Sequence, residues 1–123
     1  MRTLLIVTAL FEAATGVALV ASPSFVVSFL IGSPLDSLPG SVVARLAGVA
    51  LLTLGVVCWL ARNDQMNRVM VGPVSAMLLY NIAAATLLIY ARLGLRLSGV
   101  GLWPAVVLHA IFALWCIACL RPQ

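Results

Sequence analysis

Four long apolar runs dominate this sequence, and no other feature restricts its fold as strongly. Each run has about the 20 residues that a helix needs to cross roughly 30 Å of hydrocarbon. Inside a bilayer the backbone must satisfy its own hydrogen bonds, so such a run folds as a helix. We therefore predict an all-α, integral membrane four-helix bundle, a single domain over residues 1–123 with spans at about 3–21, 42–61, 69–91 and 100–120.

Composition excludes the main water-soluble alternatives. The chain is 64% hydrophobic and 8% charged, whereas a soluble domain has about 45–50% apolar and about 25% charged residues. A soluble fold of 123 residues could not bury so much apolar surface. The net charge of +4 comes from arginines that mostly flank the apolar runs, as in membrane proteins, and they form no basic cluster for nucleic acid. We expect the lipid bilayer as partner and no nucleic acid.

The connection between the first two spans is longer and more apolar than the others. Ser22 suits the position before a helix, Pro23 suits its first turn, and Gly32 suits its end. We predict a short interfacial helix over about 23–32, followed by a turn. The alternative is that the first helix continues through a kink at Pro23.

Arginines distinguish the two ends of the predicted bundle. With the N-terminus inside, the cytoplasmic side receives more of them than the other side. The inner group is Arg2, Arg62, Arg68 and Arg121, and the outer group is Arg92 and Arg96. Because positive charge concentrates in cytoplasmic loops, we expect a multi-pass protein of the bacterial cytoplasmic (inner) membrane with both termini in the cytoplasm.

Polar side chains interrupt the apolar runs at one depth. Glu12, Asn81 and His109 fall near the middle of the first, third and fourth spans, and Thr53 falls near the middle of the second. A charged residue at the bilayer centre costs about 2.5–3.5 kcal/mol on insertion scales, so an ionisable residue there is a functional hypothesis by default. We expect these groups to face one another inside the bundle.

Arg45 is the expected partner of Glu12. It enters the second span about two turns from the centre, and an opposite charge nearby stabilises both ionised groups. We expect an ion pair, which serves either as a structural bridge or as part of a functional site. The candidate ligand- or proton-binding residues are Glu12, Arg45, Asn81, His109, Thr53 and Tyr80, the last adjacent to Asn81.

This polar layer fits two different roles. Glu12 and His109 at one depth could hold and release a proton, since histidine titrates near neutrality. The same groups could bind a small polar or cationic ligand between the helices. The sequence therefore predicts small-ligand binding or proton-linked transport. The alternative is a non-catalytic accessory or assembly subunit of a larger membrane complex, where the polar groups only join helices. Either a homo-oligomer or such a larger complex could be the protein partner.

Other chemistry finds little support in the sequence. Cys116 and Cys119 form a CxxC pair, but the four-helix thiol oxidoreductases that resemble vitamin K epoxide reductase use a second cysteine pair, which this chain lacks. Buried cysteine also packs as a small apolar residue. His109 is the single histidine, which disfavours a two-histidine haem site. No nucleophile–base pair or phosphate loop indicates an enzyme, and we expect no catalytic residue, cofactor or metal.

Short motifs give two family resemblances. A glutamate midway along the first span is similar to the small multidrug resistance transporters, and the matching stretch is Phe11-Glu12-Ala13-Ala14-Thr15-Gly16. That resemblance implies a shared proton and substrate site at Glu12, but the long first connection, Arg45 and His109 depart from the family. The chain resembles more closely the small uncharacterised bacterial four-helix membrane proteins of the DoxX-like kind. That resemblance implies the four-helix architecture and no settled activity, and it rests on Glu12, Gly16 and Pro23, then Arg45-Leu46-Ala47-Gly48 and Gly55.

Overall fold

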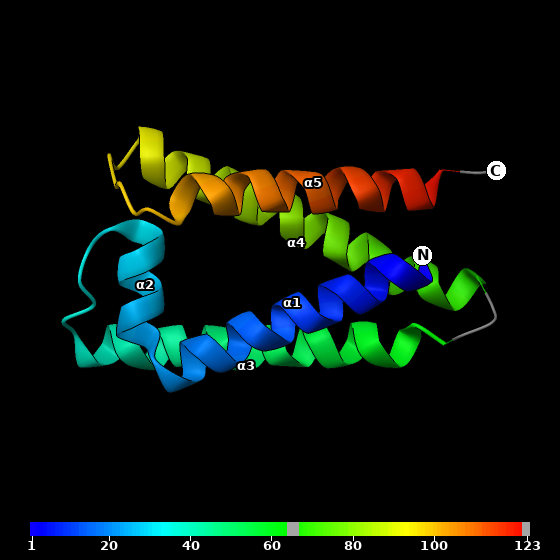
Figure 1. Cartoon of the computed structure of the whole chain (residues 1–123), viewed down its shortest axis with the longest axis horizontal. Coiled ribbons are helices and arrows are strands. Elements are labelled where there is room, and N and C mark those ends of the chain that lie inside the picture. Colours follow the sequence, from blue (N-terminus) through cyan, green and yellow to red (C-terminus); the bar gives the residue numbers. More distant parts are fainter. Residues whose placement is uncertain (64–66, 122–123) are drawn as a thin grey trace.

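The computed structural model describes residues 1–63 and 67–121, with the backbone alone for 67–69. Within this part of the chain all regular structure is helical (Figure 1). The helices are α1 (Arg2–Ala21), α2 (Pro23–Ile31), α3 (Leu38–Ala61), α4 (Asn67–Leu93) and α5 (Leu102–Leu120). The four longer helices are each long and apolar enough to cross a membrane. The predicted all-α membrane bundle is confirmed.

Helix α2 is separate from α1 and runs across one end of the bundle (Figure 1). Ser22 leaves the helical conformation with φ −141° and ψ 70°. Pro23 then occupies the first turn of α2, and Gly32 ends it in the left-handed conformation with φ 75°, which glycine adopts without strain. The Ser22 side chain makes no capping hydrogen bond. The short helix predicted over 23–32 is confirmed, and the continuous first helix kinked at Pro23 is wrong.

Helix α3 begins at Leu38, earlier than the predicted start near residue 42. The Ser37 side chain accepts a hydrogen bond of 3.1 Å from the Gly40 N–H, which satisfies one of the free donors of the first turn. Pro39 follows within that turn, where its missing N–H does no harm. The prediction from apolar residues alone placed the start of the helix too late, because its first turn contains polar and proline residues.

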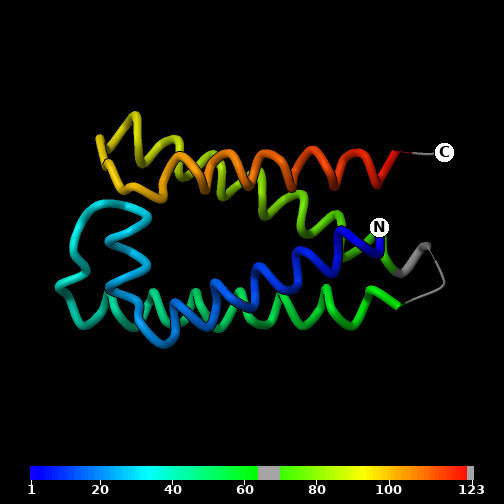
Figure 2. The backbone as a smooth tube through the Cα atoms, in the orientation of Figure 1, coloured from blue at the N-terminus to red at the C-terminus, as the bar shows by residue number. Residues whose placement is uncertain are grey.

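The four long helices pack as two antiparallel pairs, α1 with α3 and α4 with α5 (Figures 1 and 2). Helix α1 begins and helix α5 ends at the same end of the bundle (Figure 2). Glycines allow α1 and α3 to approach closely, as the small-residue pattern of lipid-embedded helices predicts. A Cβ added to Gly16 would lie 2.7 Å from the Gly48 carbonyl oxygen, and one added to Gly55 would lie 3.0 Å from the Ala9 carbonyl oxygen.

The two pairs meet mainly near their ends. At the end that carries the termini, α1 contributes to a buried apolar cluster with α3, α4 and α5, which includes Leu4, Leu5, Cys58, Met70, Val74, Met77, Phe112 and Cys116. At the opposite end, α2 bridges to the start of α5, where the Gly101 N–H donates a hydrogen bond of 2.9 Å to the Phe29 carbonyl oxygen. The middle of the bundle, between these contacts, holds the polar residues.

Candidate functional site

Three of the predicted site residues are buried inside the bundle. Glu12 and Asn81 are 0% exposed, and His109 is 8% exposed. They belong to α1, α4 and α5 respectively, so both helix pairs contribute to one polar layer. These side chains therefore face the interior of the bundle, where a polar group avoids the cost of contact with lipid.

His109 is held by a chain of hydrogen bonds on the α4–α5 side. The Asn81 Nδ2 group donates to the Met77 carbonyl oxygen at 2.8 Å, which turns the amide oxygen of Asn81 away from its own helix. That oxygen lies 2.8 Å from His109 Nδ1. Since an amide oxygen only accepts, Nδ1 carries the proton, and in the neutral ring Nε2 is left as an acceptor.

The Glu12 carboxyl group, in contrast, is not held by hydrogen bonds among the described residues. Both of its carboxyl oxygens are buried and have no hydrogen-bond partner among the described residues. The hydroxyl of Thr8, one turn earlier, is also buried and has no hydrogen-bond partner there. An unpaired carboxylate away from water is strongly unfavourable. Glu12 must therefore either hold a proton or pair with a positively charged group that comes from outside the described chain.

Tyr80 lies between Glu12 and His109. Its ring meets the His109 imidazole edge-on, with the centroids 5.6 Å apart. Its hydroxyl is near enough to interact with the Glu12 carboxyl, although the two groups do not reach hydrogen-bond geometry. Tyr80 thus links the α1 and α5 sides of the polar layer.

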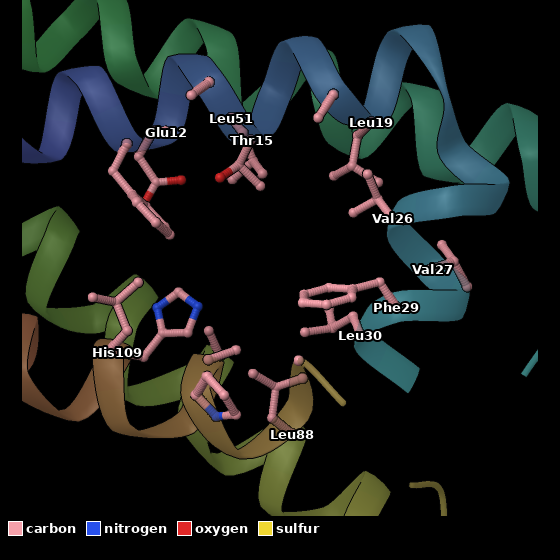
Figure 3. A pocket seen from close by; sticks show the side chains of 18 of the residues that line it. Glu12, Thr15, Leu19, Val26, Val27, Phe29, Leu30, Leu51, Leu88 and His109 are labelled. Carbon is pink, nitrogen blue, oxygen red and sulfur yellow. The ribbon is translucent and has the colours of Figure 1, made fainter. Parts of the chain in front are cut away.

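A cavity of about 800 Å³ separates the two helix pairs and reaches this layer (Figure 3). Its polar lining residues are Glu12, Thr15, Tyr80 and His109, and the remaining walls are apolar. Helices α1, α2, α4 and α5 supply most of the walls, and α3 adds Leu51. The volume falls within the range of about 300–1,000 Å³ that is typical of small-molecule sites.

The cavity has a polar end and an apolar end. Glu12 and Thr15 point into it opposite His109 (Figure 3). Towards α2 the walls contain only hydrocarbon side chains, which are Leu19, Val26, Val27, Phe29 and Leu30 (Figure 3). The arrangement therefore matches a molecule with one hydrogen-bonding group on an apolar body.

Arg45 does not join this site, and the predicted ion pair with Glu12 is wrong. Arg45 is exposed on α3, while the Glu12 oxygens have no partner in the described chain. The reason is the register of the α1–α3 pair, in which Gly48 lies against Gly16 and Gly55 against Ala9. Glu12 is thus level with the part of α3 around Leu52, between these glycines. Arg45 lies closer to the α2 end than this level by roughly 10 Å, at a rise of about 1.5 Å per residue.

Thr53 also lies outside the site. It is exposed on α3, and its hydroxyl donates to the Val49 carbonyl oxygen at 2.9 Å. Gly48 and Gly55 occupy the face of α3 that meets α1, and successive residues of a helix point about 100° apart. The depth of Thr53 suggested membership of the polar layer, but depth does not specify which face of the helix a residue occupies.

The candidate list omitted Thr15 and the whole contribution of α2. The i, i+3 spacing predicts Thr15 on the same side of α1 as Glu12, and Thr15 does line the cavity. The contribution of α2 to the cavity wall could not be predicted from the sequence, because its lining residues are typical apolar residues of an interfacial helix. These residues are Val26, Val27, Phe29 and Leu30.

The cysteines belong to the apolar core or its border, not to the cavity. Cys58 and Cys116 are buried and Cys119 is half-buried, all as free thiols. None of them lines the cavity. Among residues 1–63 and 67–121 no cluster of three metal-ligating side chains occurs.

No family model, no curated protein and no solved structure matches this chain. The resemblances drawn from short motifs around Glu12 and Arg45 therefore stay predictions.

Proposed function

We propose that this membrane protein binds a small ligand in the cavity between its two helix pairs, with Glu12 as the anchor, and that binding is linked to proton exchange at Glu12. One observation carries the proposal: a fully buried carboxyl group, without a hydrogen-bond partner among residues 1–63 and 67–121, faces a cavity of about 800 Å³. A site that leaves such a group unpaired gains free energy when a ligand satisfies it.

Proton exchange at Glu12 follows from the same lack of a partner for its carboxyl group. Glu12 without a ligand needs a proton or a cation, because the described chain supplies no counter-charge. A ligand that donates a hydrogen bond or carries positive charge can take over that task and allow the proton to leave. Such competition at one carboxyl group is the minimum requirement for proton-linked transport, which we propose as the use of this site.

The accessory-subunit alternative makes a different demand on Glu12. A purely structural role is expected to keep the carboxyl group in a closed pair with another side chain. The exposed position of Arg45 and the open space beside Glu12 favour the ligand-binding role instead.

The proposal includes an orientation in a bacterial cytoplasmic membrane, with both termini in the cytoplasm. Its support is the larger number of arginines at that side of the sequence. Reporter fusions at the C-terminus would test this: a fluorescent protein is expected to be active there, and a secreted phosphatase inactive. The reverse pattern contradicts the orientation and leaves the cavity site unaffected.

Ligand binding can be tested by native mass spectrometry of the full chain released from lipid nanodiscs. The panel consists of short and long primary amines, alcohols, carboxylic acids and quaternary ammonium ions. At least one class is expected to bind the wild type and to bind Glu12→Gln at least about tenfold more weakly. Thr53→Val, which removes a polar group at similar depth outside the cavity, is the matched control and should bind as the wild type does. Equal binding by Glu12→Gln and wild type would sink the proposal.

A further inference from the structure

We infer that the ligand of this cavity is a membrane-dissolved, single-chain amphiphile with a small hydrogen-bond-donating head, and that it enters sideways from the hydrocarbon of the bilayer. This rests on the proposed function and adds a ligand class and a route to it.

The polar end of the cavity is rich in acceptors. Asn81 fixes the proton of His109 on Nδ1 and leaves Nε2 as an acceptor in the neutral ring. Glu12 offers at least one acceptor oxygen in either protonation state, and neither oxygen is used within the described chain. A primary amine head can donate to both groups, and a hydroxyl head can donate to one of them. A quaternary ammonium head carries a charge for Glu12 but has no donor for His109 Nε2, and a carboxylate or sulfate head would face another acid.

The rest of the cavity selects an apolar body. Beyond Glu12, Thr15, Tyr80 and His109, its lining is hydrocarbon as far as α2. Burial of apolar surface contributes roughly 25 cal/mol per Å², so an alkyl chain along this wall adds binding free energy that a short polar molecule cannot obtain. The head then lies at the depth of the helix centres, which favours a small head because polar groups are costly at the bilayer midplane.

Packed residues lie at both ends of the cavity along the helix axes. Leu5, Val74 and Phe112 belong to the apolar cluster at the end with the termini. At the other end, α2 lies against the start of α5, with the Gly101 N–H bonded to Phe29 O at 2.9 Å. A water-soluble molecule therefore has no direct path along the bundle axis.

The sides are more open. Several lining residues are themselves exposed, and they come from both helix pairs and from α2: Ala14, Ala18, Phe29, Leu87 and Pro104. All of them are apolar, and four of the five lie on helices that can span the membrane. An opening bordered in this way faces lipid chains, so a ligand that reaches it must already be dissolved in the bilayer.

The single histidine of the chain makes a direct reporter. The full chain is placed in lipid nanodiscs with isotope-labelled histidine, and the His109 Nε2 resonance is followed by NMR. Decanol and decylamine are expected to shift this resonance saturably, whereas decane, decyltrimethylammonium and decyl sulfate are not. Methanol and methylamine should need at least about a hundredfold higher concentration, since they lack the apolar body.

Two variants test the side entrance. Ala18→Phe and Ala14→Leu enlarge exposed lining residues and should weaken decanol binding and slow its exchange, each by about tenfold. Ala110→Phe enlarges an exposed alanine of α5 that does not line the cavity, and it should leave binding unchanged.

Each part of the inference can fail separately. Equal binding of decylamine and decyltrimethylammonium overturns the donating head, and equal binding of methylamine and decylamine overturns the amphiphile. Unchanged exchange in both entrance variants overturns the lateral route. In the last two cases a Glu12-dependent ligand still supports the proposed function, whereas Glu12-independent binding of every probe defeats both.

Discussion

The seam between α1 and α3 and the interface between the two helix pairs are built in opposite ways. In the seam, Gly16 and Gly48 bring the backbones together so closely that neither position has room for a Cβ atom. Between the pairs, the helices border a cavity of about 800 Å³ beside a carboxyl group that has no hydrogen-bond partner in the described part of the chain. Tight backbone packing stabilises helices in lipid, whereas an unpaired buried acid destabilises them. The contrast separates the part of the bundle that maintains the fold from the part that is available for function.

The largest effect is expected in the seam. Gly48→Leu places a Cβ 2.8 Å from the Gly16 carbonyl oxygen, so α1 and α3 must move apart, with a loss of about 3 kcal/mol or more in the free energy of unfolding. Steric-trap unfolding in bicelles measures this quantity. Gly72→Leu is the matched control, because an added Cβ there meets nothing within 4 Å. Similar losses for both variants would mean that the seam is not the stabilising contact.

A smaller effect with a different signature is expected for Glu12→Gln. The substitution removes a group that can become charged and that makes no hydrogen bond within the described chain. The free energy of unfolding should therefore stay the same or increase by up to about 1 kcal/mol, while ligand binding weakens by about 1.5–3 kcal/mol. Bicelle unfolding and the binding assay are run on the same preparation. A clear loss of stability would place Glu12 with the seam, as a structural residue.

Asn81→Leu is expected to act on both stability and site geometry. It leaves His109 Nδ1 buried without the 2.8 Å contact to the Asn81 amide oxygen, which costs about 1–3 kcal/mol. The His109 NMR signal should then show a mixture of tautomers, because Nδ1 no longer has a fixed acceptor. Thr86→Val removes an exposed side-chain bond to Ile82 O and serves as control. An unchanged tautomer in Asn81→Leu would contradict the positioning of His109 by Asn81.

The smallest effects are expected for Arg45→Gln and Thr53→Val. Both side chains are exposed on α3 and neither lines the cavity. Changes at such positions normally stay within about 0.5 kcal/mol of the wild-type stability, and ligand binding should be unchanged. The unfolding and binding measurements used for Glu12→Gln check both. A tenfold loss of binding in Arg45→Gln would restore the predicted pair with Glu12.

The sequence predicted only some members of the polar layer correctly. Glu12, Asn81 and His109 were recognised because a polar group at membrane depth is costly and must turn inwards. Their depth and type were enough to place them in the interior, where they are buried. Thr53 met the same depth criterion, and Arg45 was expected to reach Glu12 from about two turns away. Both are exposed instead, because a long or hydrogen-bonded polar side chain can also remain on an exposed face of a helix.

The sequence by itself determined that this protein has four helices able to span a membrane and a short helix at Pro23–Ile31. Apolar length, proline and glycine fix such elements locally. Only the tertiary structure decided that α1 pairs with α3 and α4 with α5, and that the space between the pairs remains open around Glu12. Helix pairing depends on which faces meet and in which register, and a chain that is apolar on nearly all faces does not specify either locally.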